Sequence, residues 1–125
     1  MKMFGALIFL FASSTFAGSG IVPVTVGQSG PEFDACPSLG LVTVKSTLRS
    51  GRGTNFARDM SLDEQSRLYI CGESKSGRWN AIVLSQDCIL DCRAASPVPN
   101  HQPYAGPCVS GWVPSRYVKV IAGAV

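Results

Sequence analysis

Charge is sparse in this chain, and it does not gather anywhere. Charged residues make up 15% of the sequence, and its 11 Lys and Arg and 8 Asp and Glu residues are scattered without a run of like sign. Such dispersed charge is typical of an ordinary solvated surface, and it gives no indication of a nucleic-acid or anionic-membrane partner. No segment shows sustained helical periodicity. A helical fold is therefore not expected.

Signals of catalysis are equally scarce. The one histidine, His101, lies in a proline-rich stretch, and no Gly-x-Ser-x-Gly motif of a serine hydrolase is present. A thiol hydrolase would need a low-pKa thiolate beside an oriented imidazole, which no pattern here indicates. Zinc ligands could be drawn from Cys88, Cys92, His101 and Cys108, but thiolates outside the cytoplasm tend to oxidise to disulfides. We expect no enzyme, no metal and no cofactor.

The longest apolar run lies at the N-terminus. Met3–Phe11 follows a basic residue and precedes small residues that end at Ala17. This is the layout of a secretory signal peptide, and the run is far shorter than the ~20 residues of a membrane span. We expect residues 1–17 to be a signal peptide and the protein to be exported, either periplasmic or secreted, with no membrane span.

The rest of the chain is expected to form one domain. Residues 18–35 are rich in glycine, so we expect a flexible leader there, although Ile21–Val26 could pair as an edge strand. The compact domain is expected over residues 36–125. Five cysteines fall within it, and in an exported chain of this size they indicate disulfides, each stabilising the fold by ~2–4 kcal/mol. Their odd number leaves one thiol over.

Short strands dominate the pattern of the domain. The two clearest, Arg67–Cys71 and Arg78–Leu84, are separated by a polar turn and predict a hairpin. Met60–Gln65 could form one helical turn at most. Residues 86–107 contain four prolines and no periodicity, so we expect a loop tethered by disulfides. Further strands are predicted at Leu41–Val44, Gly111–Val113 and Tyr117–Ile121, which together indicate a small all-β barrel or sandwich.

Two segments carry a family resemblance. Residues 47–56 read TLRSGRGTNF and residues 110–118 read SGWVPSRYV. They resemble the opening and closing motifs of the bacterial SH3 family (SH3b, SH3 type 3), and the similarity extends over Cys36–Gly123. It is closest to a secreted, cysteine-containing subgroup, through a Gly-Pro-Cys-x-Gly-Trp-like pattern before Trp112. Three residues depart from the family pattern. Arg52 and Gln65 stand where the family usually has proline and glycine, and Cys88 has no counterpart in it.

The resemblance implies a fold and a disulfide pairing. The fold would be a small SH3-like barrel of about five to six short strands with a long disulfide-tethered loop. The favoured pairing joins Cys36 to Cys71 and Cys92 to Cys108, although four cysteines allow three connectivities. Cys88 would then be the free thiol, through which two chains could be joined as a disulfide-linked dimer.

The resemblance also implies a non-enzymatic binding groove lined by aromatic side chains. Arg49 and Arg116 could receive a carboxylate from a peptide ligand. Trp112 has a competing interpretation as a core residue, because large apolar side chains dominate the packing of small barrels. The resemblance, applied position by position, also makes Asn55, Phe56, Trp79, Trp112 and Tyr117 candidates for ligand binding.

The implied function is an exported binding module for cell-wall peptide or an envelope protein. Two alternatives remain open, namely a secreted inhibitor or effector that docks through its disulfide loop, and a purely structural envelope protein. Ser96–Pro99 should favour an extended polyproline conformation, the kind of ligand that SH3-type grooves accept. We therefore also consider that the loop lies over the domain's own groove and blocks it.

Overall fold

The structure, a computed structural model, describes residues 20–85 and 91–123. These residues confirm the predicted all-β class, with nine strands and one short 3-10 helix. The expected signal peptide and the expected free thiol Cys88 lie outside the described residues. The elements are β1 (Thr25–Val26), β2 (Ser38–Val42), β3 (Ser46–Arg49), β4 (Arg58–Leu62), β5 (Arg67–Glu73), β6 (Trp79–Leu84), β7 (Gln102–Pro103), β8 (Ser110–Pro114), the 3-10 helix η2 (Ser115–Tyr117) and β9 (Val118–Gly123).

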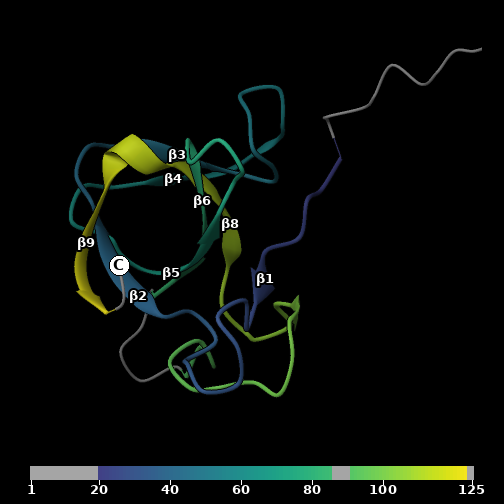
Figure 1. The fold of residues 1–125 in the computed structure, drawn as a ribbon. Coiled ribbons are helices and arrows are strands. Elements are labelled where there is room, and N and C mark those ends of the chain that lie inside the picture. The colour runs from purple at the N-terminus through teal and green to yellow at the C-terminus, as the bar shows by residue number, and fades with distance from the viewer. Residues whose placement is uncertain (1–19, 86–90, 124–125) are drawn as a thin grey trace, which may run out of the picture.

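Seven of these strands form one antiparallel sheet in the order β4-β3-β8-β6-β5-β2-β9. The sheet curls around a core (Figure 1). It does not close, because β4 and β9 are its two edges and are not paired with each other. The prediction of a small barrel with about five to six strands is therefore wrong in closure and in strand number. Strands β4 and β7 were not among the predicted ones, and β7 forms a separate two-stranded sheet with β1, which lies within the possible edge strand Ile21–Val26.

The core of the curled sheet follows the alternation expected of strands with one buried face. Along β2 the residues Ser38, Gly40 and Val42 are buried, while the two leucines between them are only half-buried. The predicted hairpin is confirmed, since β5 pairs with β6 in antiparallel register. The largest fully buried side chains in this core are Leu48, Leu62, Leu68, Ile82, Val42 and Val113.

The expected helical turn at Met60–Gln65 is wrong. Met60 and Leu62 belong to β4, which pairs with β3, and Leu62 is buried in the core. Burial of that side chain and the backbone pairing with β3 outweigh the weak local helix signal. A tight turn follows, in which Gln65 has a φ of 71° and its N–H donates to the carbonyl of Val42 at 2.8 Å. A left-handed backbone of this kind favours glycine over residues that carry a Cβ.

We expect Gln65→Gly to raise the free energy of unfolding by about 0.5–1 kcal/mol. The left-handed conformation costs a residue with a Cβ about 1–2 kcal/mol, and the greater freedom of glycine in the unfolded chain offsets part of the gain. Gln65→Ala is the matched control and should give no gain, because alanine keeps the Cβ. Urea denaturation followed by circular dichroism measures both, and equal stability of the two variants would contradict the explanation.

Residues 20–35 were expected to be a flexible leader, and they are instead part of the folded domain. Val24 and Val26 are 3% and 4% exposed. The N–H of Val22 donates to the carbonyl of Ser50 at 2.8 Å, and β1 pairs with β7. The two valines belong to a second core cluster, which lies on the opposite face of β6 and β8 from the first. Their burial explains why a glycine-rich segment is held in place, and the alternative of an edge strand here is correct for Thr25–Val26.

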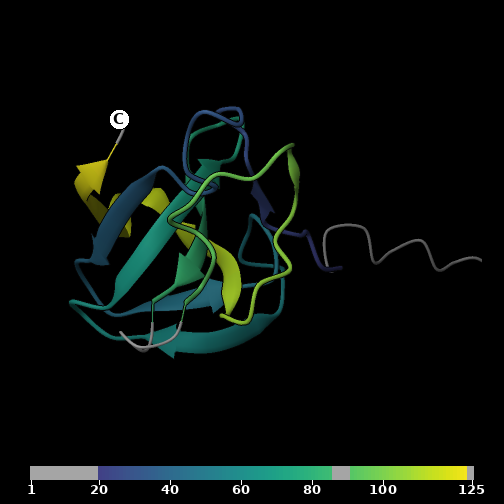
Figure 2. The ribbon, with the colours of Figure 1, turned by 90° about the horizontal axis from the view of Figure 1, so that it is seen from below.

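The long loop that precedes β8 is held in place by a disulfide and by backbone hydrogen bonds. Cys92 is bonded to Cys108 (S–S 2.05 Å) and Cys36 to Cys71 (S–S 2.08 Å), which is the pairing favoured by the resemblance. The N–H groups of Ala35 and Cys36 donate to the loop carbonyls of Ser96 and Ala94, both at 2.8 Å. Figure 2 shows the loop beside the segment that precedes β2.

Tyr104 fixes the far part of this loop. Its hydroxyl donates to the carbonyl of Cys92 at 2.7 Å and accepts from the N–H of Cys108 at 3.1 Å, so it joins the two ends of the shorter disulfide ring. Burial raises the pKa of Tyr104 above its ordinary value, because the phenolate would lose its hydration there. The neutral hydroxyl, which can both donate and accept, is therefore the form that the loop requires.

Candidate functional site

A groove of about 600 Å³ lies between β3 and η2. Its lining combines four basic residues, Lys45, Arg49, Arg78 and Arg116, with two aromatic residues, Trp79 and Tyr117. No acidic residue is among the described residues that line it. The remaining lining residues are small or carry hydroxyl groups, apart from one proline. The groove is therefore cationic at its rim and partly aromatic.

One wall of the groove is built by the turn before β6 and by η2. Trp79 pairs with Pro114 in the register of β6 and β8. The N–H of Ser115 donates to the carbonyl of Arg78 at 2.9 Å, and the Ser115 hydroxyl donates to the carbonyl of Gly77 at 2.6 Å. These bonds hold Arg78 and Trp79 beside the first residues of η2, although the two segments are far apart in sequence.

The opposite wall is held by Arg49 at the end of β3. One guanidinium nitrogen of Arg49 donates to the carbonyls of Thr54 and Phe56, at 3.1 and 3.0 Å. Arg49 therefore ties down the loop between β3 and β4, which projects from the sheet in Figure 1. Gly51 is required in that loop because a Cβ there would overlap the ring of Phe56. Arg49 both lines the groove and positions its wall.

Tyr117 and Arg116 close the end of the groove. The Arg116 guanidinium lies 4.9 Å from the centre of the Tyr117 ring, a cation–π contact. The Tyr117 carbonyl accepts a hydrogen bond from the N–H of Thr43 at 2.8 Å, which anchors the end of η2 just before β9. Tyr117 is half-buried and Arg116 is exposed. The arrangement leaves an aromatic face with a cation above it.

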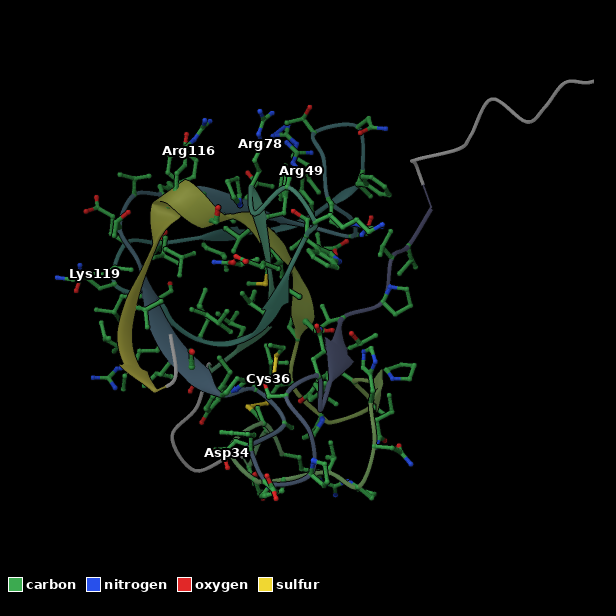
Figure 3. All side chains as sticks on the ribbon, in the orientation of Figure 1. Asp34, Cys36, Arg49, Arg78, Arg116 and Lys119 are labelled. Carbon is green, nitrogen blue, oxygen red and sulfur yellow. A yellow bond between two sulfur atoms is a disulfide. The ribbon has the colours of Figure 1, made fainter. Side chains whose placement is uncertain are left out.

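A second hollow, of about 420 Å³, adjoins the first. The two share Arg78 and Trp79, and the second adds Arg52 and Lys75. No acidic residue is among the described residues that line this hollow either. Trp79 thus lies between two cationic hollows. Figure 3 shows Arg49, Arg78 and Arg116 together at one end of the molecule, with Cys36 and Asp34 at the other. We call the surface formed by both hollows the basic groove.

The structure brings together four of the seven candidate residues, Arg49, Trp79, Arg116 and Tyr117. Asn55 and Phe56 do not line the basic groove, although their loop forms its wall. Trp112 is 6% exposed, and its indole N–H donates to the carbonyl of Val22 at 2.9 Å. Its assignment to ligand binding is therefore wrong, and its interpretation as a core residue is correct.

Arg78 and Lys45, together with Arg52 and Lys75 of the second hollow, were not among the predicted binding residues. Arg78 directly precedes Trp79 in the hairpin, so its sequence position was a usable signal. Lys45 lies in the short connection between β2 and β3, and only the fold places it opposite η2. Dispersed charge in the sequence thus becomes a local cationic surface, because the connections at one end of the sheet each carry a basic residue.

The disulfide loop does not cover the groove, so the idea of a self-blocking polyproline segment is wrong. None of the described loop residues 91–109 lines either hollow, since the loop is held against residues 22–36 at the other end. Cys92 and Cys108 are bonded to each other and offer no thiolates for zinc. The described part of the chain contains no cluster of three metal-ligating side chains and no helix able to cross a membrane.

Comparison with protein-family models, with curated proteins and with solved structures finds no match to this chain. The geometry of the basic groove is therefore the main ground on which a function can be argued.

Proposed function

We propose that this protein is an exported, non-enzymatic SH3b-like binding module, and that its basic groove binds peptides that carry carboxylates. The ligand that fits best is cell-wall peptide, and an acidic segment of an envelope protein is the second. The resemblance at residues 47–56 and 110–118 supports the class of module. The two disulfides within the chain are consistent with an oxidising location outside the cytoplasm.

The observation that carries the proposal is the combination of cations and aromatic faces without a neutralising acid. Guanidinium groups bind carboxylates through two parallel hydrogen bonds, which gives both strength and direction. Trp79 and Tyr117 are half-buried and present ring surface on which the apolar part of a peptide can pack. Like charges around one hollow raise the positive potential there and attract an anionic ligand. A short peptide with spaced carboxylates uses all of these features.

We expect Arg78→Glu and Arg116→Glu each to weaken retention on insoluble peptidoglycan by at least about tenfold. A charge-assisted hydrogen bond contributes about 1.5–3 kcal/mol, and about 1.4 kcal/mol corresponds to a factor of ten. Both side chains are exposed, so neither change should affect folding. The measurement is a pull-down of the oxidised protein over a range of peptidoglycan concentrations.

Lys119→Glu is the matched control, because it makes the same charge change on β9, outside the groove. It should leave retention nearly unchanged. Equal losses in the control and the groove variants would show a non-specific charge effect and contradict the proposed site. If even the parent protein is not retained, cell-wall peptide is excluded as the ligand and an envelope protein takes its place.

A further inference from the structure

An exposed acidic turn lies just before the first disulfide. Pro31, Glu32, Phe33 and Asp34 are all exposed, and Phe33, a large aromatic residue, is 49% exposed. The N–H of Phe33 donates to the carbonyl of Gly30 at 3.2 Å, which closes a turn with Pro31 in its second position. Proline favours that position because its φ is fixed at the required value. The turn thus presents an aromatic ring between two carboxylates in a preorganised conformation.

The chemistry of this turn complements that of the basic groove. The turn offers two carboxylates and a ring, and the groove offers cations around Trp79 and Tyr117. Asp34 lies at the opposite end of the molecule from Arg49, Arg78 and Arg116 (Figure 3). A turn in that place cannot reach its own groove. It can reach the groove of a second molecule.

We propose that the turn Pro31–Asp34 of one molecule docks in the basic groove of a second copy of this chain. Phe33 packs against Trp79 and Tyr117 of the second copy, and Glu32 and Asp34 pair with arginines at its rim. The contact joins two different surfaces, so each molecule keeps one free turn and one free groove and the assembly extends head to tail. The inference rests on the proposed use of the groove as a binding site, but not on its cell-wall ligand.

The contact is expected to be weak and dependent on salt. A single turn buries much less than the ~1,200 Å² of a stable interface, so its dissociation constant should lie between about 10 μM and 1 mM. Exposed ion pairs are screened by salt, which should weaken the association further. Self-association and peptide binding use the same groove and would therefore compete. High local concentration would favour the assembled form.

The test is sedimentation of the full oxidised protein at increasing concentration in low salt. Every sample carries Cys88→Ser, so that a disulfide between chains cannot contribute. The parent should form dimers and longer species by about 1 mM. A turn variant (Glu32→Lys with Asp34→Lys) and a groove variant (Arg78→Glu with Arg116→Glu) should each stay monomeric alone. Lys119→Glu, outside both surfaces, should associate like the parent.

An equimolar mixture of the turn variant and the groove variant should associate again, because the turn variant supplies an intact groove and the groove variant supplies an intact turn. Equal amounts of reversed carboxylates and reversed arginines would also attract each other, so Phe33→Ala alone is measured as an uncharged probe. It should weaken association at least about tenfold.

A parent that remains monomeric at the highest concentration would overturn the inference. Association that persists in Phe33→Ala and in the groove variant would also overturn it, because the contact would then lie elsewhere. The turn variant keeps its groove, so it should still be retained on peptidoglycan. Retention on peptidoglycan separates the two proposals. A turn variant that no longer self-associates but still binds peptidoglycan supports docking of the turn in a second copy. A parent protein that fails to bind peptidoglycan contradicts only the proposed cell-wall ligand.

Discussion

Replacing Trp112 with alanine is expected to lower the free energy of unfolding by about 3–5 kcal/mol, the cost of removing a buried tryptophan. Trp112 is 6% exposed and belongs to the core cluster that joins β8 to the N-terminal segment. Its indole N–H also donates a hydrogen bond to the carbonyl of Val22. A domain of this size has about 5–15 kcal/mol of stability in total, so the variant would be close to unfolding. Urea denaturation followed by far-ultraviolet circular dichroism gives the value.

Two comparisons make the Trp112 prediction specific. Trp112→Phe keeps a ring in the core and loses the hydrogen bond to Val22, so it should cost only about 1–2 kcal/mol. Trp79→Ala removes the same side chain from a half-buried site in the groove, and should cost less stability than Trp112→Ala while abolishing retention on peptidoglycan. The reverse order of stabilities would show that the roles assigned to the two tryptophans are wrong.

Removing the Cys36–Cys71 disulfide, with Cys36→Ala and Cys71→Ala together, is expected to cost about 3–4 kcal/mol. The two cysteines are 35 residues apart, so their bond removes considerable freedom from the unfolded chain. Both are also buried, at 3% and 2% exposure, in the cluster that contains Trp112. Thermal and urea denaturation of the double variant against the oxidised parent measure the loss.

The second disulfide is the matched comparison. Cys92 and Cys108 are only 16 residues apart, and their removal should cost about 3 kcal/mol. We expect the damage to concentrate in the loop, which would become sensitive to protease. The basic groove should keep its binding, because no residue from the described part of the loop lines it. Loss of binding in this variant, with the rest of the domain folded, would contradict the separation of loop and groove.

Local pattern predicted the parts of the fold that depend on neighbours in sequence. The hairpin of β5 and β6 joins strands separated by five residues, and its apolar strands and polar turn are visible in the sequence. The pairing of β1 with β7 was not predictable in this way, because its partners Thr25 and Pro103 are far apart in the sequence. The prediction of a flexible leader over residues 18–35 fails within the described residues 20–35 for the same reason, since partners of this segment lie in distant loops.

The site was predicted in part, because residue type alone does not determine how deeply a side chain is buried. Trp79 and Trp112 are the same residue on adjacent strands, yet one lines the groove and the other is buried. The register of β6 and β8 sets Trp112 opposite Ala81 and Trp79 opposite Pro114, so the two indoles lie on the same face of the sheet. They differ in burial because Trp79 is the first residue of β6, at the end of the strand. That register depends on contacts between distant segments. The basic character of the groove likewise arises only when separate connections meet.

The open sheet has a practical consequence for anyone who modifies the protein. Strand β9 is hydrogen-bonded to β2 on one side and forms an outer edge on the other, with Val120 and Ile121 41% and 39% exposed. An edge of this kind is a template for strand addition, and a lysine such as Lys119 is a common protection against it. Labels and crosslinkers that neutralise lysine would therefore favour aggregation. The exposed turn at Asp63–Gln65 is a safer place for them.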